Sequence, residues 1–297
     1  MKKRKKRREA PTPAAAPSRD MPWVAPALIA LCAILFYWTP MTSPSASIQW
    51  DAADMHYPLQ KYFSDRLLSG KLPFWTPYLF SGYPLLANPE VGAWYPPHWP
   101  FFLAGIAPRS IQFELALNAF LACLGAYFLI LRQVASRAAA VLGALAYGLS
   151  GFFAGHSSHV GLFSAAAGFP WLLLAYRRAA DSAAFRYTAL GGLAGGAMIL
   201  AGYTQTAVYG FLGLGLYSLA DLWGRGRRWL RTTAIVGGML AGALACAAIQ
   251  ILPGLGKFRA PIQGWFLVAF GLALLAAAGG NWLFARWRIP YLGIMVA

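Results

Sequence analysis

Two carboxylates directly follow the first apolar run of this chain, and their position suits them to chemistry. Asp51 and Asp54 are three residues apart. On one helical turn they would share a face, whereas on an extended segment they would point apart. A carboxylate within hydrogen-bond reach of a hydroxyl can remove its proton as a general base. Asp54 also suits the N-cap of a following helix, so we favour Asp51 as the base and keep Asp54 as the second candidate.

Other candidate residues follow in the same segment and in two later turns. Between residues 71 and 102, Trp and Tyr alternate with prolines; such rings seat a protein on lipid headgroups and also stack on sugars. Glu90 could orient a substrate or pair with a cation, His156 and His159 form an HxxH turn, and Gln205 lies in a second turn. Together with two later cations, the predicted substrate-binding residues are Glu90, Tyr83, Trp94, Tyr95, His156, Gln205, Lys257 and Arg259.

A divalent-metal site is an alternative interpretation of some of these residues. It would combine Asp51 and Asp54 with His56 and the HxxH histidines, since carboxylates and imidazoles are common metal ligands. However, HxxH between membrane helices more often forms a polar turn or a hydrogen bond to a substrate hydroxyl. We therefore expect neither a metal nor another cofactor.

The elements that must position these residues are membrane helices. The 297 residues are 59% hydrophobic and only 11% charged, against about 25% charged in ordinary soluble domains, and the mean hydropathy is +0.51. A soluble globule of this length could not bury so much apolar surface. The composition excludes a soluble enzyme, a disordered chain and a fibrous protein. It predicts an all-α polytopic membrane protein.

The apolar runs give the expected number of helices. A hydrocarbon core of about 30 Å needs about 20 apolar residues at 1.5 Å per residue. Approximate runs of this kind predict eight transmembrane helices, at 22–40, 111–131, 138–154, 160–176, 187–203, 205–223, 232–252 and 264–284. We assign residues 22–288 to a single transmembrane domain, and 289–297 to the start of a further, truncated helix.

The distribution of charge predicts the orientation of these helices. The formal charge is +16, but the cations lie in a basic tail and in short gaps between apolar runs, which argues against nucleic acid as a partner. With a cytoplasmic N-terminus, 19 Lys and Arg fall inside and 6 outside. Residues 1–21 are then a disordered cytoplasmic tail beside membrane lipid, and 41–110 form an extracytoplasmic loop. Lys257 and Arg259 also fall outside, where they could bind a phosphate or ordinary lipid headgroups.

The long first loop carries a predicted helix of its own. From Pro58 to Ser69 the apolar side chains recur at helical spacing, and Gly70 supplies a stop. This pattern predicts a short amphipathic helix lying in the plane of the membrane interface. Asp51 and Asp54 stand just before it.

Several stretches resemble one family of bacterial membrane proteins. "WDAADMHYPLQKYF" and "GKLPFWTPYLFSGYPLLANPEVGAWYPPHWP" in the loop, and then "GHSSHVGLFSAAAGFPWLLL", "GYTQTAVYGFLGLGLYSL" and "AAIQILPG", resemble the YfhO family. Its members look like GT-C glycosyltransferases that use lipid-linked sugars. The resemblance implies a GT-C-like fold in the bacterial cell membrane and the transfer of a sugar from a polyprenyl phosphate to a cell-envelope glycan or protein. It places the first-loop acid at the DxxD stretch that begins with Asp51.

Two other functions remain open. The first is a transporter or flippase of lipid-linked intermediates, for which ionisable residues in the middle of the membrane are expected. Glu114 and Asp221 lie near the ends of their runs, which argues against a proton-coupled transporter. The second is a membrane assembly protein without catalytic activity, whose aromatic loop would be a docking surface.

Cysteine labelling tests the predicted topology. If residues 41–110 are outside, Ser81→Cys should react with a membrane-impermeant thiol reagent on intact cells, and Ser182→Cys should not. The unmodified chain gives the background from the native cysteines. Labelling of Ser182→Cys without labelling of Ser81→Cys would reverse the orientation and with it the side on which Asp51 lies.

Overall fold

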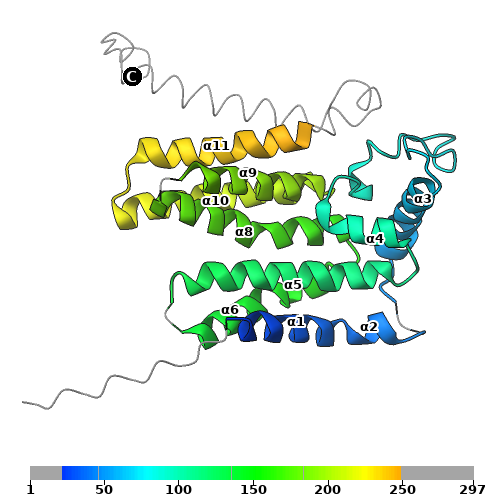
Figure 1. Cartoon of the computed structure of the whole chain (residues 1–297), viewed down its shortest axis with the longest axis horizontal. Helices are drawn as coiled ribbons and strands as arrows, with labels where there is room; N and C mark the ends of the chain where they lie inside the picture. Colours follow the sequence, from blue (N-terminus) through cyan, green and yellow to red (C-terminus); the bar gives the residue numbers. More distant parts are fainter. Residues whose placement is uncertain (1–21, 46, 135, 183, 249–297) are drawn as a thin grey trace, which may run out of the picture.

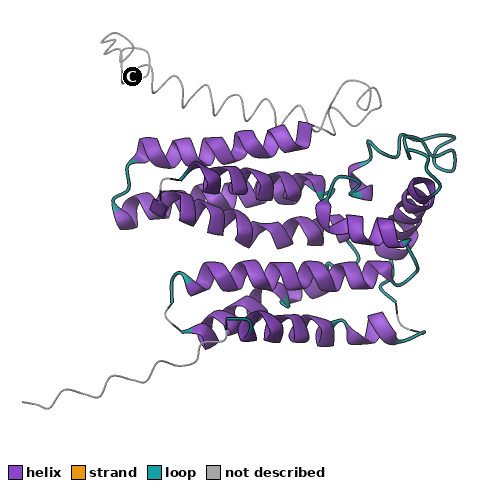
Figure 2. Cartoon of the chain, in the orientation of Figure 1, coloured by secondary structure: helices purple, strands orange, loops and turns teal. Residues whose placement is uncertain are grey.

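The computed structural model describes residues 22–45, 47–134, 136–182 and 184–248, and the regular elements in these ranges are helices (Figures 1 and 2). The expectation of an all-helical fold is confirmed for this part of the chain. The basic tail 1–21, the predicted run 264–284 and residues 289–297 lie outside the described residues. In chain order the elements are α1 (Val24–Phe36), α2 (Trp38–Thr42), the π-helix η1 (Ala52–His56), α3 (Tyr57–Leu68), the 3-10 helices η2 (Pro89–Val91) and η3 (Pro96–His98), α4 (Trp99–Ala104), α5 (Ser110–Leu131), α6 (Arg137–Gly148), α7 (Gly151–Gly155), α8 (Val160–Ser182), α9 (Phe185–Leu200), α10 (Thr204–Arg225) and α11 (Trp229–Ala247).

The long helices lie roughly side by side, and the short helices α3 and α4 gather at one end of the bundle (Figure 1). We call this end the loop end, because residues 47–109 lie there. The opposite end carries a cluster of arginines, described below, and we call it the arginine end. The first turn of α8 and the α9–α10 turn also lie at the loop end (Figure 1).

Within the described residues, four helical segments are long and apolar enough to cross a membrane: Ser110–Leu131, Arg137–Gly155, Val160–Ser182 and Trp229–Ala247. These segments support a membrane protein. They are fewer than the eight predicted spans, of which the run 264–284 lies outside the described residues. Helix α1 has only 13 residues and α9 has 16, so both are shorter than about 20 residues.

Proline explains why the first apolar run does not form one long helix. Pro40 has no N–H group and cannot donate to the carbonyl of Phe36 four residues earlier. Helix α1 ends at Phe36, and the chain continues as the short helix α2. The predicted span 22–40 is therefore divided near its end.

A second proline lies inside α8, where a side chain replaces the missing hydrogen bond. Pro170 cannot donate to the carbonyl of Ala166, which is four residues earlier. The hydroxyl of Tyr147, on α6, donates to that carbonyl over 2.9 Å. A carbonyl without a donor is costly in apolar surroundings, so this hydrogen bond both supports α8 and links it to α6.

Tight packing of small residues joins α9 to α11. The sequence GGLAGG at 191–196 places glycines along the buried part of α9. A side chain on Gly192 would meet the backbone of Gly242 on α11. Small residues at such contacts let two helix backbones approach closely.

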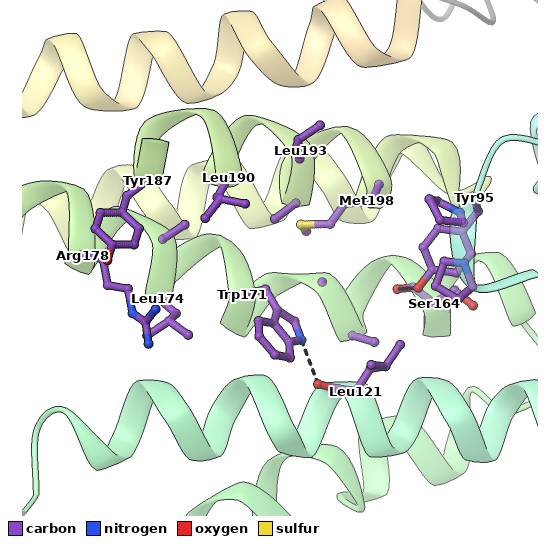
Figure 3. Close-up of a pocket in the computed structure, with 17 residues that line it drawn as sticks. Tyr95, Leu121, Ser164, Trp171, Leu174, Arg178, Tyr187, Leu190, Leu193 and Met198 are labelled. Atoms are coloured by element: carbon purple, nitrogen blue, oxygen red, sulfur yellow. Dashed lines mark hydrogen bonds between the residues drawn. The ribbon is translucent and has the colours of Figure 1, made fainter. Parts of the chain in front are cut away.

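A hydrogen bond joins α8 to α5. Trp171 on α8 donates its indole N–H to the carbonyl of Leu121 on α5 over 2.9 Å (Figure 3).

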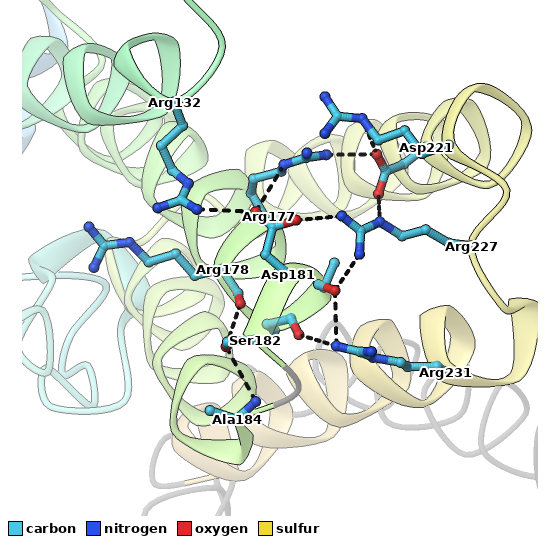
Figure 4. A network of polar contacts seen from close by, with 12 residues as sticks. Arg132, Arg177, Arg178, Asp181, Ser182, Ala184, Asp221, Arg227 and Arg231 are labelled. Atoms are coloured by element: carbon cyan, nitrogen blue, oxygen red, sulfur yellow. Dashed lines mark hydrogen bonds and ion pairs between the residues drawn. The ribbon is translucent and has the colours of Figure 1, made fainter.

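Ion pairs hold the arginine end together (Figure 4). Asp221 on α10 lies 2.7 Å from Arg177 on α8 and 2.8 Å from Arg227. Asp181 on α8 contacts Arg132, just after α5, over 3.1 Å, and also pairs with Arg227. Two aspartates thus connect α5, α8, α10 and the segment that leads into α11.

The segment at the loop end has a small hydrophobic core of its own. The helix predicted from Pro58 to Ser69 is α3, which buries Leu59 and Phe63. These side chains pack with Leu85, Val91, Ala93, Phe102 and Ile106. The buried hydroxyl of Ser64 donates to the carbonyl of Phe102 over 2.7 Å. This segment is therefore a packed structure that can hold side chains in fixed positions.

Removing one charge from the arginine end should destabilise the protein. Asp221→Asn would leave the buried guanidinium of Arg177 without its 2.7 Å partner. Breaking a buried ion pair on one side costs about 3–5 kcal/mol. We expect a loss of about that size in the free energy of unfolding, measured in mixed detergent micelles.

The matched control for this substitution is Asp65→Asn. Asp65 pairs with Lys61 on the exposed surface of α3, and exposed pairs contribute little to stability. Equal effects of the two substitutions would contradict a structural role for the arginine end.

Candidate functional site

The two candidate bases lie at the beginning of one helical segment. Asp51 occupies the N-cap position of η1, and Asp54 lies inside it. The prediction that Asp54 caps the following helix is wrong, because the helical segment begins three residues earlier and continues directly into α3. Both residues are exposed.

Asp51 is close to the HxxH turn. Its Oδ2 lies 3.7 Å from Nε2 of His159, the residue just before α8, and the two side chains are 52% and 47% exposed. The ring of His156 lies 5.8 Å from that of His159, and its Nδ1 is 2.8 Å from the carbonyl oxygen of Phe152. The fold therefore brings the first-loop acid to a turn about 100 residues later in the sequence.

Glu90 lies near enough to Asp51 to be affected by its charge. It is in η2, where its backbone N–H donates to Oδ1 of Asn88 over 3.0 Å, and its carbonyl oxygen is 3.1 Å from Nδ1 of the buried His56. Burial, and then the negative charge of Asp51, raise the pKa of the Glu90 carboxyl. A carboxyl group whose pKa is raised by burial and by a neighbouring charge is typical of functional sites.

The α9–α10 turn packs against the segment that carries Glu90. Gly202 has φ of +105°, and a side chain there would meet the carbonyl oxygen of Pro89. Glycine is needed at this position both for its backbone conformation and for the close approach. Gln205, in the first turn of α10, donates its amide to the hydroxyl of Tyr209 over 2.6 Å. The first loop, the HxxH turn and the α9–α10 turn therefore meet at the loop end.

The predicted aromatic residues have different environments. Tyr83 is half-buried and forms an isolated β-bridge with Thr76, and burial followed by the charge of Glu90 raises its pKa. Trp94 is also half-buried and packs on the core of the loop segment. Tyr95 is only 4% exposed and donates its hydroxyl to Oδ1 of Asn118 over 2.7 Å. Tyr95 is thus committed to the interior, while Tyr83 and Trp94 are partly accessible.

A buried polar group beneath these residues was not predicted. Nε2 of His98 lies 2.6 Å from Oε1 of Glu114, and both side chains are almost fully buried. Asn118, one turn further along α5, receives the hydroxyl of Tyr95 and donates to the carbonyl of Glu114 over 3.0 Å. The sequence signal was the pair of polar residues, Glu114 and Asn118, at i and i+4 in an apolar run, which usually marks a functional position.

The candidate metal ligands do not form a metal site in the described part of the chain. There, no group of three or more His, Cys, Asp or Glu side chains is arranged to hold a metal ion. Lys257 and Arg259, the predicted phosphate ligands, lie outside the described residues.

The arrangement at the loop end is suited to acid–base chemistry. Asp51 is half-exposed, next to an imidazole that can donate a hydrogen bond or carry a positive charge. Glu90 has a raised pKa, which makes it a stronger base than an ordinary carboxylate. The partly accessible rings of Tyr83 and Trp94 lie in the same segment. Such a site can accept a proton from a bound hydroxyl.

Stability should fall in mild acid because His56 is buried. Burial lowers the pKa of His56 from 6.5, although the charge of Glu114 and the carbonyl of Glu90 act in the opposite direction. Below pH 6.5 the unfolded chain binds a proton that the folded chain does not, so stability decreases as the pH falls toward the lowered pKa. Thermal midpoints measured in detergent between about pH 7.5 and about pH 5 should show this fall, and His56→Gln should reduce it.

The control for this measurement is His156→Gln, which should leave the pH dependence unchanged. His156 lies in the half-exposed turn before α8, where its Nδ1 is 2.8 Å from the carbonyl oxygen of Phe152. An unchanged pH dependence in His56→Gln would assign the effect to another group.

Comparison with protein-family models, with curated proteins and with solved structures finds no match for this chain. The resemblance to the YfhO family therefore stays a prediction, and the function has to be argued from the site itself.

Proposed function

We propose that this chain is an integral membrane glycosyltransferase that moves a sugar from a polyprenyl phosphate to a hydroxyl of a cell-envelope glycan or protein. The observation that carries the proposal is the cluster at the loop end, where Asp51 lies 3.7 Å from His159 and close enough to Glu90 to raise its pKa. The apolar helices that could span a membrane support access to a donor carried on a lipid. The proposed location is the outer face of the bacterial cell membrane.

In the proposed reaction Asp51 is the general base. Its carboxylate takes the proton of the acceptor hydroxyl while the hydroxyl oxygen bonds to the anomeric carbon of the sugar. The bond between that carbon and the phosphate oxygen breaks, and the polyprenyl phosphate leaves with the electron pair. A phosphate leaves readily as an anion, so a second carboxylate is not needed to protonate it.

The neighbouring residues take supporting roles in this proposal. His159, whose Nε2 is 3.7 Å from the Asp51 carboxylate, is proposed to orient this carboxylate when the acceptor is bound. Tyr83 and Trp94 offer ring faces to a sugar, while the buried Tyr95 fixes the end of their segment to α5 through its hydrogen bond to Asn118. Gln205 and His156 are candidates for hydrogen bonds to sugar hydroxyls, and Lys257 and Arg259 for contacts with the phosphate.

Replacing the base tests this mechanism directly. Asp51→Asn keeps the size of the side chain but removes its basicity, so transfer from a polyprenyl-phosphate sugar should fall about 10²–10⁴-fold. The variant should still insert into the membrane and bind the donor. Activity is measured as the rate of sugar transfer in proteoliposomes.

Asp54→Asn is the matched control, because Asp54 is exposed one helical turn further along. It should reduce transfer much less than Asp51→Asn. Full activity of Asp51→Asn together with loss of activity in Asp54→Asn would reverse the two roles. If both variants remain active and Glu90→Gln is inactive, Glu90 is the base.

A transporter of lipid-linked intermediates is the second candidate. The position of Glu114 near the start of α5 argues against it, but the burial of Glu114 against His98, which was not predicted, favours it. Ionisable side chains inside a membrane bundle often take part in proton-coupled transport, and these two are 2.6 Å apart with almost no exposure. For a transporter, Glu114→Gln should abolish proton-dependent movement of the lipid-linked substrate, and Asp51→Asn should leave it intact.

A further inference from the structure

An apolar groove of about 440 Å³ lies between α5, α8 and α9 (Figure 3). Tyr95, Pro96 and Ser164 line it at the loop end, and Arg178 and Tyr187 line it at the arginine end. Ser164 and Arg178 are both on α8, and at 1.5 Å per residue they are about 21 Å apart along the helix. The groove is therefore longer than one leaflet of the hydrocarbon core, which is about 15 Å thick.

The walls of the groove suit a hydrocarbon chain. Small residues along its middle, such as Ala167, Gly168 and Ala194, leave the space open. Leu190 and Leu193 line it from α9 and are 51% and 57% exposed. Water would find few hydrogen-bonding partners along this surface, whereas a lipid chain would cover it favourably.

Among the described residues that line the groove, one is charged, and it lies at one end. Arg178 follows Arg177 in the sequence but points away from the ion pairs of the arginine end (Figure 4). Asp181 and Asp221 are paired there with Arg132, Arg177, Arg225 and Arg227. The guanidinium of Arg178 instead lies 5.7 Å from the centre of the Tyr187 ring.

The charge of Arg178 has no carboxylate partner among the described residues. Its Nε is buried and makes no hydrogen bond within that part of the chain. A buried guanidinium N–H without an acceptor is costly, and a phosphate fits the planar fork of arginine well. The geometry therefore favours an anionic group at this end of the groove.

We propose that the groove binds one anionic phospholipid, with an acyl chain between α5, α8 and α9 and the headgroup phosphate on Arg178. Contacts with the acyl chain supply the apolar contribution to binding, and Arg178 supplies the preference for negative charge. With the predicted orientation, this lipid belongs to the cytoplasmic leaflet. The proposal does not depend on sugar transfer, because the reaction is assigned to residues at the other end of the bundle.

Native mass spectrometry of the full chain, purified in mild detergent with phosphatidylglycerol or phosphatidylcholine, tests the charged end. The wild-type chain should retain one phosphatidylglycerol in preference to phosphatidylcholine. Arg178→Gln should weaken that retention about tenfold or more, since a hydrogen-bonded charge is lost, and Arg178→Lys should weaken it less. Equal retention of the two lipids by the wild type, or unchanged retention by Arg178→Gln, would overturn the proposal.

Arg186→Gln is the matched control for the charge. Arg186 also stacks on Tyr187, at 4.9 Å from the ring centre, but is not part of the groove lining. Its replacement removes one positive charge from the same end and should leave lipid retention at the wild-type level. Inorganic phosphate should not displace the lipid. Displacement would mean that the site binds free phosphate without an acyl chain, which would contradict the proposal.

The apolar part of the groove has an independent test. Ala194→Phe would fill the middle of the groove and should reduce retention of both lipids. If this variant does not fold, the comparison of Arg178→Gln with Arg186→Gln still tests the proposal. A photo-reactive residue at Leu193 should form an adduct with the lipid in membranes. A crosslink from this position to residues 264–284 of the same chain would instead identify a protein segment as the occupant and would overturn the proposal.

Discussion

In helices as apolar as these, each backbone carbonyl has to find its donor within the protein, and the arrangement of the bundle depends on this constraint. The carbonyl of Ala166 is the clearest example. Pro170 leaves it without a helical partner, and the hydroxyl of Tyr147 supplies the hydrogen bond from α6. Because a phenol has to reach that one carbonyl, α6 and α8 can pack in few ways. The indole of Trp171 has the same effect between α8 and α5, through the carbonyl of Leu121.

The two ends of the bundle are held by different interactions. At the arginine end, two aspartates are shared among arginines from several helices, and Arg178 is left facing the apolar groove. At the loop end, packing dominates, and Gly202 lets the α9–α10 turn approach the backbone of Pro89. Catalysis is proposed at the loop end and lipid binding at the arginine end, and the groove between α5, α8 and α9 runs from one end toward the other. An anionic lipid in this groove would contact α8, which begins just after His159, the residue near Asp51.

The loop end contains two kinds of carboxyl group, and they bear on different functions. Asp51 is exposed, and its charge adds to burial in raising the pKa of the half-buried Glu90, which suits a proton transfer to or from a bound molecule. Glu114 is buried against His98 in the interior, where a proton could be held but where a sugar acceptor has little access. The first arrangement supports the glycosyltransferase and the second the transporter, so separate substitutions at the two sites distinguish these functions.

The all-helical fold, most of the helical segments and α3 could be predicted from the sequence, because apolar content, helical periodicity and the positions of glycine are local properties of the chain. The sequence also placed Asp51 at the start of a long loop between apolar runs. The packing of the helices determines which residues meet: His159 with Asp51, the turn at Gly202 with the segment of Glu90, and His98 with Glu114. It also determines that Tyr95 is buried, that Asp54 is not a cap and that Arg178 turns away from the neighbouring ion pairs. These facts depend on contacts between residues far apart in the chain, and local patterns carry no information about which distant side chains will share the limited space between helices.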